Sequence, residues 1–156
     1  MVWKPHVTVA AVVECDGRFL LVEEETSEGV MFNQPAGHLE PGESIVAGVQ
    51  RETLEETAYE FTPEHLVGIY RWSKPGDELT YLRFAFSGKL GTHHRERTLD
   101  TGIIRAVWLT REEIRASTAR HRSPLVVRCM EDYLAGKRFA IDALIECSAT
   151  GAEQVG

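Results

Sequence analysis

The chain has 156 residues and 43% apolar composition, which is enough for one sizeable core and little for two, so we expect a single domain. Its 17 basic and 24 acidic residues give a net charge of −7, which argues against a nucleic-acid binder and means that a phosphate-bearing ligand needs a cation. The three cysteines fit neither a disulfide framework nor a zinc site, and no segment has the roughly 20 apolar residues of a membrane helix, so we expect a cytoplasmic protein without a membrane partner.

The first elements read as a hairpin, a loop and a helix. Residues 6–13 and 18–24 are rich in β-branched and aromatic residues and flank Asp16-Gly17, a dipeptide typical of a tight hairpin turn. The opening residues do not resemble a signal peptide. A stretch rich in glycine and proline follows at 35–43, and the next run, to Thr57, predicts a helix capped by Glu43 or Ser44.

The rest of the chain predicts three strands and two short helices. The strands cover residues 65–72, 79–88 and 104–109. One helix begins after Thr110, and the other follows Pro124 and stops at Gly136. Long β stretches interrupted by one central helix favour an α+β fold with a mixed-sheet sandwich. We expect one domain over residues 1–146 and a flexible polar tail over 147–156.

The helix after the glycine-rich loop carries three glutamates on one face. Glu52, Glu55 and Glu56 lie at offsets of three and four, within one arc of about 100°. Like charges at these offsets repel one another, and a divalent cation such as Mg²⁺ or Mn²⁺ removes the conflict because it prefers carboxylate oxygens. The ordinary alternative is a solvated acidic face, which is what most such helices carry.

The loop before the helix favours the metal site, because its glycines allow backbone groups to approach a metal and a phosphate. Gly37, five residues, Glu43, seven residues, Arg51-Glu52, two residues and Glu55-Glu56 reproduce the spacing of the Nudix box, GX5EX7REUXEEXGU. The chain therefore resembles the Nudix family of hydrolases. It departs from the box at two positions, where Thr53 replaces a bulky aliphatic residue and Ala58 replaces a glycine.

Further segments resemble bacterial phosphatases of this family in matching order over about residues 4 to 135. They are 4–10, 33–40, 82–84 and 122–126. The resemblance implies the Nudix fold, an α/β/α sandwich with a central mixed β-sheet. It also implies Mg²⁺-dependent release of phosphate from nucleoside tri- and diphosphates, with Mn²⁺ as a possible substitute, and action on the pyrimidine pyrophosphate precursor of thiamine.

Position by position, the resemblance assigns roles to the box residues. Glu52 and Glu56 are the principal metal ligands, and Glu55 is either a further ligand or the base that activates water. The backbone carbonyl of Gly37, or that of Ala36 beside it, completes the coordination. Two more box residues, Glu43 and Arg51, form a structural ion pair that orients the helix and the loop, and direct contact with the phosphates is the alternative.

The substrate-binding residues are less sharply indicated, since each candidate also has an ordinary structural explanation. They are Arg83 and Arg122 for phosphates, Asn33 and Gln34 for a ring edge, and His38 beside the phosphates. An arginine of this kind is as often a surface ion pair, and the amides can simply hold the loop. Phe32 and Trp72 can stack on a base or belong to the core.

Two other functions stay open at this point. One is hydrolysis of a dinucleotide polyphosphate or of ADP-ribose, and the other is a catalytically idle Nudix domain that senses a ligand. The sensor alternative is disfavoured because all five charged residues of the box are present. We expect the partner to be a small phosphorylated molecule, and the chain to be a monomer or a homodimer.

Overall fold

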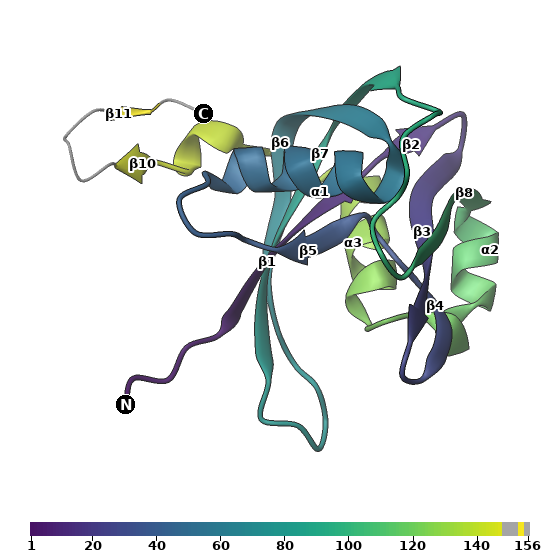
Figure 1. The fold of residues 1–156 in the computed structure, drawn as a ribbon, viewed down its shortest axis with the longest axis horizontal. Coiled ribbons are helices and arrows are strands. Elements are labelled where there is room, and N and C mark those ends of the chain that lie inside the picture. Colours follow the sequence, from purple (N-terminus) through teal and green to yellow (C-terminus); the bar gives the residue numbers. More distant parts are fainter. Residues whose placement is uncertain (148–152, 155–156) are drawn as a thin grey trace.

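The structure is a computed structural model that describes residues 1–147 and 153–154. Its helices and strands, labelled in Figure 1, are β1 (His6–Val12), β2 (Glu14–Cys15), β3 (Arg18–Thr26), β4 (Gly29–Asn33), β5 (Ala36–His38), α1 (Ile45–Thr57), β6 (Tyr59–Ser73), β7 (Thr80–His93), β8 (Ile103–Thr110), α2 (Arg111–Ala116), η1 (Thr118–Arg120), α3 (Leu125–Leu134), β9 (Phe139–Ala140), η2 (Ile141–Ala143), β10 (Glu146–Cys147) and β11 (Glu153–Gln154).

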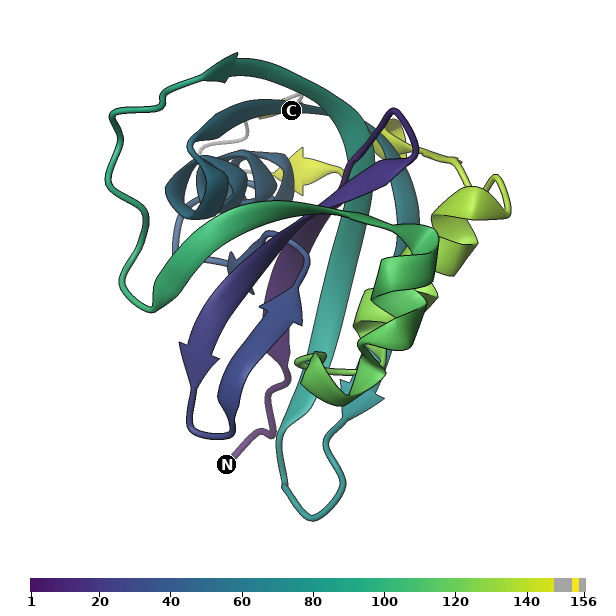
Figure 2. The ribbon, with the colours of Figure 1, turned by 90° about the vertical axis from the view of Figure 1, so that its right-hand side faces the viewer.

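The strands form two main sheets between helices. The larger sheet has the order β5-β1-β7-β6-β9, in which β1 and β7 are parallel and the other pairs are antiparallel. The second sheet pairs β3 with β2, β4 and β8. Figure 2 shows α1 on one side of the strands and α2 with α3 on the other. The predicted α/β/α sandwich with a mixed sheet is confirmed.

Strand β1 runs through the middle of the molecule, and both of its faces are buried. Ala10 and Val12 belong to the core cluster that includes Met130 of α3, whereas Val9 and Ala11 belong to the cluster that includes Val49 of α1. A strand that packs against a helix on each side is apolar at successive positions rather than at alternate ones. The run from residue 9 to 13 has that composition.

The predicted hairpin is present, but its first arm is shorter than expected. Asp16 and Gly17 have φ values of 50° and 78°, as a tight hairpin turn requires, and they join β2 to β3. The predicted pairing with 18–24 is wrong for residues 6–12, because β1 pairs with β5 and β7 in the other sheet; Val13 O still accepts from Leu20 N at 3.0 Å. The strong burial of β1 on both faces explains its central place.

Helix α1 begins and ends as its sequence allows. Of the two predicted caps, Ser44 caps it, with the Ser44 hydroxyl accepting from Ala47 N at 3.0 Å. Ala58 ends it in the left-handed conformation, φ 62°, where glycine is usual. Thr53 is fully buried, and its hydroxyl donates to Val49 O at 2.7 Å, so the polar atom of this unusual box residue is satisfied within the helix.

The later elements lie where they were predicted, although β6 and β7 are longer. The strand predicted over 65–72 begins earlier, at Tyr59, and β6 accommodates Pro63 at a shift in its pairing with β7. Thr110 and Glu113 form the capping box of α2. None of the helices in the described part of the chain is long and apolar enough to cross a membrane.

The division into a domain over 1–146 and a flexible tail over 147–156 stays a prediction. Residues 148–152 and 155–156 of that tail lie outside the described residues. Within the described part, the backbone of 146–147 pairs with that of 153–154.

Candidate active site

The glutamate face of α1 lies against the edge strand β5. A Cβ atom built on Gly37 would overlap the carboxylate of Glu52, so this close approach requires glycine at position 37. Gly37 is extended within β5, whereas the turn before the helix is made by Gly42 with φ 80°. The glycine at the start of the box therefore makes room for a carboxylate.

Glu56 lies deeper along the same edge. Its Oε1 accepts the backbone N–H of Ala36 at 2.9 Å, and the residue is only 7% exposed. Burial raises the pKa of Glu56 to about 8, and the negative charges of Glu52, Glu24 and Asp100 add to this effect, while the Ala36 N–H opposes it. None of the described Lys, Arg or His side chains pairs with Glu56 within 4.0 Å, so its carboxylate lacks a protein cation.

Arg51 holds the loop and the helix together. Its guanidinium donates to both oxygens of Glu43, at 2.7 and 2.9 Å, and to His38 O at 3.0 Å. The same side chain reaches Glu52 at 2.8 Å and Glu55 at 3.1 Å. The hydrogen bonds from Arg51 lower the pKa of Glu43. The hydrogen bonds to Glu43 and Glu52 raise the pKa of Arg51. This geometry agrees with a structural ion pair.

The three glutamates do not converge on one point in this structure. Arg51 contacts Glu52 and Glu55, and Glu56 faces Ala36; among the described residues, no three His, Cys, Asp or Glu side chains are grouped so as to hold a metal. The donors still fit a hard divalent cation chemically, because they are carboxylate oxygens and one of them is buried without a counter-ion.

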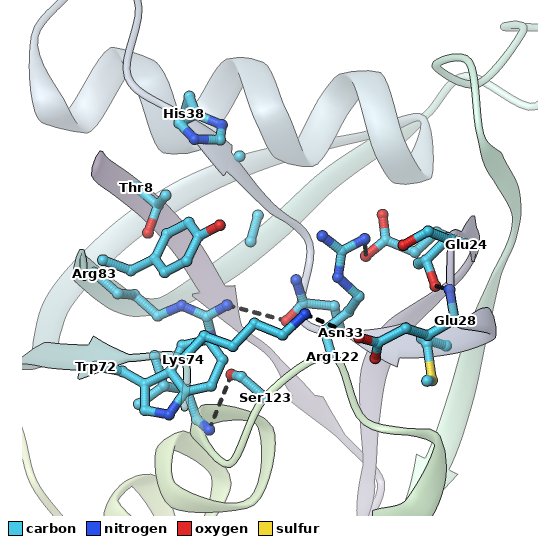
Figure 3. A pocket seen from close by; sticks show the side chains of 17 residues that line it. Thr8, Glu24, Glu28, Asn33, His38, Trp72, Lys74, Arg83, Arg122 and Ser123 are labelled. Carbon is cyan, nitrogen blue, oxygen red and sulfur yellow. Dashed lines mark hydrogen bonds and ion pairs between the residues drawn. The ribbon is translucent and has the colours of Figure 1, made fainter. Parts of the chain in front are cut away.

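A cavity of about 310 Å³ opens beside β5 (Figure 3). Its wall includes Ala36, Gly37 and His38, so the cavity adjoins the strand against which the glutamates of α1 lie. Four of the five predicted substrate residues lie on this wall: Asn33, His38, Arg83 and Arg122. The structure thus brings together side chains from β4, β5, β7 and the loop before α3.

The fifth predicted substrate residue, Gln34, is placed behind the wall. It is 2% exposed; its side-chain nitrogen donates to Val126 O at 2.8 Å, and its oxygen accepts from Arg83 Nη1 at 3.0 Å. Arg83 Nη2 also donates to Asn33 Oδ1 at 3.0 Å, as Figure 3 shows. Gln34 is therefore positioned to orient Arg83 and to tie it to α3.

The other cavity residues have local partners. Arg122 lies 3.4 Å from Glu24 Oε1, and its backbone N–H donates to Phe32 O at 2.9 Å. His38 Nε2 lies 3.3 Å from His6 Nδ1, and burial lowers the pKa of His38. Trp72 lines the cavity and stacks on Tyr81, with ring centroids 5.9 Å apart.

Phe32 is 5% exposed and belongs to the core, where Arg120 lies over its ring at 4.3 Å. It does not line the cavity. Of the two aromatic residues considered for stacking, Trp72 alone lies on the cavity wall.

Two carboxylates near the glutamates were not anticipated. Glu24 of β3 lines the cavity, and burial raises its pKa even though Arg122 and Arg83 lie close to it. Asp100 follows β7, and its backbone N–H donates to Glu55 O at 2.9 Å. Glu24 stands in the run of three glutamates at 23–25, which carries no distinguishing pattern, and Asp100 lies in a polar loop.

Comparisons with known proteins agree with this arrangement. The family model described as NUDIX domain matches residues 3–129. Phosphatase NudJ of Escherichia coli K12 is 38% identical over 142 residues, which cover 91% of this chain and 92% of that protein. A NUDIX hydrolase structure from Nitrosomonas europaea is 56% identical, covers 90% of this chain and 96% of its own, and superposes with a TM-score of 0.88. A MutT protein structure from Methanosarcina mazei Go1 is 23% identical and superposes with a TM-score of 0.70, so it shares the fold. The superposition covers 88% of this chain and 100% of that one.

Proposed function

The chain belongs to the Nudix hydrolase family, and we propose that it cuts the diphosphate bond of nucleoside tri- and diphosphates in a Mg²⁺-dependent reaction that releases phosphate. The observation that carries the proposal is the placement of Glu52 against Gly37 and of Glu56 on Ala36 N, at the strand edge that borders the cavity. A substrate can then place its phosphates at the edge and the rest of the molecule inside.

In this proposal Glu52 and Glu56 hold the cation, together with the backbone carbonyl of Gly37 or Ala36. Mg²⁺, or Mn²⁺ in its place, supplies neutralisation of the phosphates and a stronger acidity of the attacking water. Glu55 is either a further ligand or the base that accepts the proton of that water. Its carboxylate is partly exposed, so water can reach it, and Arg51 holds it at 3.1 Å. The ion pair of Arg51 with Glu43 holds the loop before α1 in a fixed position against the helix.

The cavity supports a substrate with an organic group on its diphosphate. Polar side chains such as Asn33 and Arg83 face it, and Trp72 with Tyr81 provides an aromatic surface. The family resemblance extends the proposal to the pyrimidine pyrophosphate precursor of thiamine. A cytoplasmic location and a monomeric or homodimeric state remain predictions.

The test is a phosphate-release and pyrophosphate-release screen with and without Mg²⁺. The substrates are nucleoside di- and triphosphates, dinucleotide polyphosphates, ADP-ribose and thiamine-type pyrophosphates. We expect metal-dependent release of phosphate from nucleoside triphosphates, followed by cleavage of the diphosphates. Cleavage confined to dinucleotides or ADP-ribose would transfer the assignment to those substrates. Binding without release from any compound would favour a ligand sensor.

A further inference from the structure

Glu24 is a largely buried carboxylate that adjoins both the cavity and the glutamates of α1. Its side chain is 17% exposed and lines the cavity. Burial raises the pKa of Glu24, and the positive charges of Arg122 and Arg83 oppose this effect. Besides burial, the charge of Glu24 raises the pKa of Glu56. Because the effect of a charge falls with distance, Glu24 lies toward the end of the cavity that is nearest the glutamates.

Strand β3 is irregular at this position. Its pairing with β8 shifts register between Glu23 and Glu24, whereas its pairing with β4 continues, with Glu24 opposite Met31. The two glutamates have different surroundings, because Glu23 pairs with Arg105 at 3.0 Å and Glu24 lines the cavity. Irregularities of this kind are frequent next to active sites, where they redirect a side chain. The regular ladder with β8 is thus interrupted at the residue that reaches the cavity.

Arg122 has a fixed backbone and a guanidinium with unused donors. Its backbone N–H donates to Phe32 O at 2.9 Å, and the hydroxyl of the next residue, Ser123, accepts from Leu125 N at 3.1 Å at the start of α3. Its side chain is 44% exposed and lies beside Glu24, with Nη1 3.4 Å from Glu24 Oε1 (Figure 3). Within the described part of the chain, this side chain makes no other ion pair and no hydrogen bond. Its remaining N–H groups can therefore bind phosphate oxygens.

We propose that Glu24 is a positioning residue that acts through Arg122: it holds the guanidinium at the end of the cavity nearest the glutamates, where Arg122 binds a phosphate oxygen of the substrate. The inference rests on the proposed function, since the phosphates belong to that substrate. A long, partly exposed arginine loses rotamer freedom when it binds a ligand. An ion pair that already restrains the side chain reduces this loss.

The negative charge of Glu24 also acts in the opposite direction, because it repels the phosphates. Arg122 and Arg83 lie close enough to Glu24 to offset this charge. We therefore expect the restraint on Arg122 to outweigh the repulsion. The two effects have opposite signs, so replacement of Glu24 distinguishes them.

The experiment is a double-mutant cycle of Glu24→Gln and Arg122→Gln, with ATP as substrate at saturating Mg²⁺. Glu24→Gln should raise KM by about threefold to tenfold, which corresponds to the cost of ordering one arginine, and should change kcat less. In the Arg122→Gln background the same replacement should change KM by less than about twofold, because Glu24 acts through Arg122. An unchanged or lower KM in Glu24→Gln overturns the proposal, and so does an equal rise in both backgrounds.

Two further variants complete the cycle. Glu25→Gln is the matched control, since Glu25 is the next residue of β3, is exposed, and has no described Lys, Arg or His partner within 4.0 Å. Its KM should stay within about twofold of the unmodified protein, and a rise equal to that of Glu24→Gln overturns the proposal. Glu24→Asp shortens the side chain and weakens the ion pair, so it replaces Glu24→Gln in the cycle if the latter does not fold. Its effect on KM should likewise disappear when Arg122 is replaced.

Binding without turnover separates this inference from the proposed function. ATP is titrated calorimetrically into the metal-free protein in EDTA, for the unmodified chain and the members of the cycle. Glu24→Gln should weaken ATP binding by about threefold to tenfold, and only when Arg122 is present. If no compound is hydrolysed but this coupling is found, the proposed function fails and the role of Glu24 holds. If hydrolysis occurs without the coupling, the proposed function holds and the role of Glu24 fails.

Discussion

The Glu56 carboxylate and the backbone N–H of Ala36 are joined by a 2.9 Å hydrogen bond that connects the C-terminal part of α1 to the edge strand β5. This bond satisfies one carboxylate oxygen and leaves the group buried without a cation partner among the described residues. The hydrogen bond makes this carboxylate a structural link between α1 and β5. The same carboxylate is suited to bind a cation, because a bound cation offsets the cost of burying an unpaired negative charge.

Removal of the charge from Glu56 or Glu52 should abolish turnover while the fold is kept. Glu56→Gln and Glu52→Gln are nearly isosteric, and the amide oxygen can still accept from Ala36 N or Arg51. We expect kcat to fall by about two orders of magnitude or more, as for the loss of an electrostatic contribution to the transition state. The measurement is phosphate release at saturating Mg²⁺, with Glu112→Gln, an exposed site on α2, as control. Near-normal turnover in either variant would remove these glutamates from the site.

Gly37→Ala should damage the site through shape alone. Its Cβ would overlap the Glu52 carboxylate, which must move away from β5. We expect a large loss of activity and of Mg²⁺ binding, with a loss of stability of about 1–3 kcal/mol from overpacking. Gly91→Ala is the matched control, because its Cβ would make ordinary contacts at 3.4 Å with Glu60. Comparable Mg²⁺ affinity in the two variants would show that the Gly37 contact is not needed.

The stability of the metal-free protein should fall as the pH rises from about 4.5 to 8. Burial raises the pKa of Glu56 from its ordinary value of 4.5 to about 8, so in this window the folded state binds a proton that the unfolded chain has released. The free energy of unfolding then decreases by up to about 1.4 kcal/mol per pH unit for one proton. The contribution of protonated Glu56 to stability is fully present below pH 4.5, and it is lost as the pH rises to about 8.

Denaturant unfolding in EDTA at pH values from 5 to 9 measures this dependence. Glu56→Gln should flatten the decline, although Glu52 and Glu24, whose pKa values burial also raises, leave part of it. Mg²⁺ should stabilise the unmodified protein more at pH 8 than at pH 5, because it binds the deprotonated carboxylate. A metal-free stability that rises from pH 5 to 8 would contradict the buried, unpaired state of Glu56.

The sequence predicted correctly the turns and helix caps that depend only on neighbouring residues. Asp16-Gly17, Ser44 and Thr110 act within a few residues of themselves, and each forms the turn or cap that was expected. The pairing of β1 was mispredicted because proximity along the chain favoured a hairpin with β3. The partner β7 lies more than 70 positions away, and only burial on both faces selects it.

The candidate site shows the same division between local and long-range information. The spacing from Gly37 to Glu56 follows from one loop and one helix, so the box was visible in the sequence. The contact of Glu24 with Arg122, and that of Arg83 with Gln34, join residues about 50 or more positions apart. Such contacts depend on how the two sheets and α3 pack, which no local pattern encodes.

The end of α1 offers a test of the remaining departure from the Nudix box. Ala58 is left-handed, φ 62°, and its backbone N–H donates to Leu54 O at 2.9 Å. A residue with a Cβ atom is disfavoured in this conformation by about 1 kcal/mol relative to glycine. Ala58→Gly should therefore stabilise the fold by up to about 1 kcal/mol, less the small apolar contact of its buried methyl group, and should leave turnover unchanged.

Denaturant unfolding of Ala58→Gly beside Ala47→Gly measures the sign of this effect. Ala47 lies in the first turn of the same helix, where glycine lowers helix stability by up to about 1 kcal/mol. The two substitutions should shift the unfolding midpoint in opposite directions, because Ala58 has a positive φ and Ala47 has the φ of a helical residue. A destabilised Ala58→Gly would mean that the packing of the Ala58 methyl group outweighs the backbone strain, and that alanine is favoured here over the usual glycine.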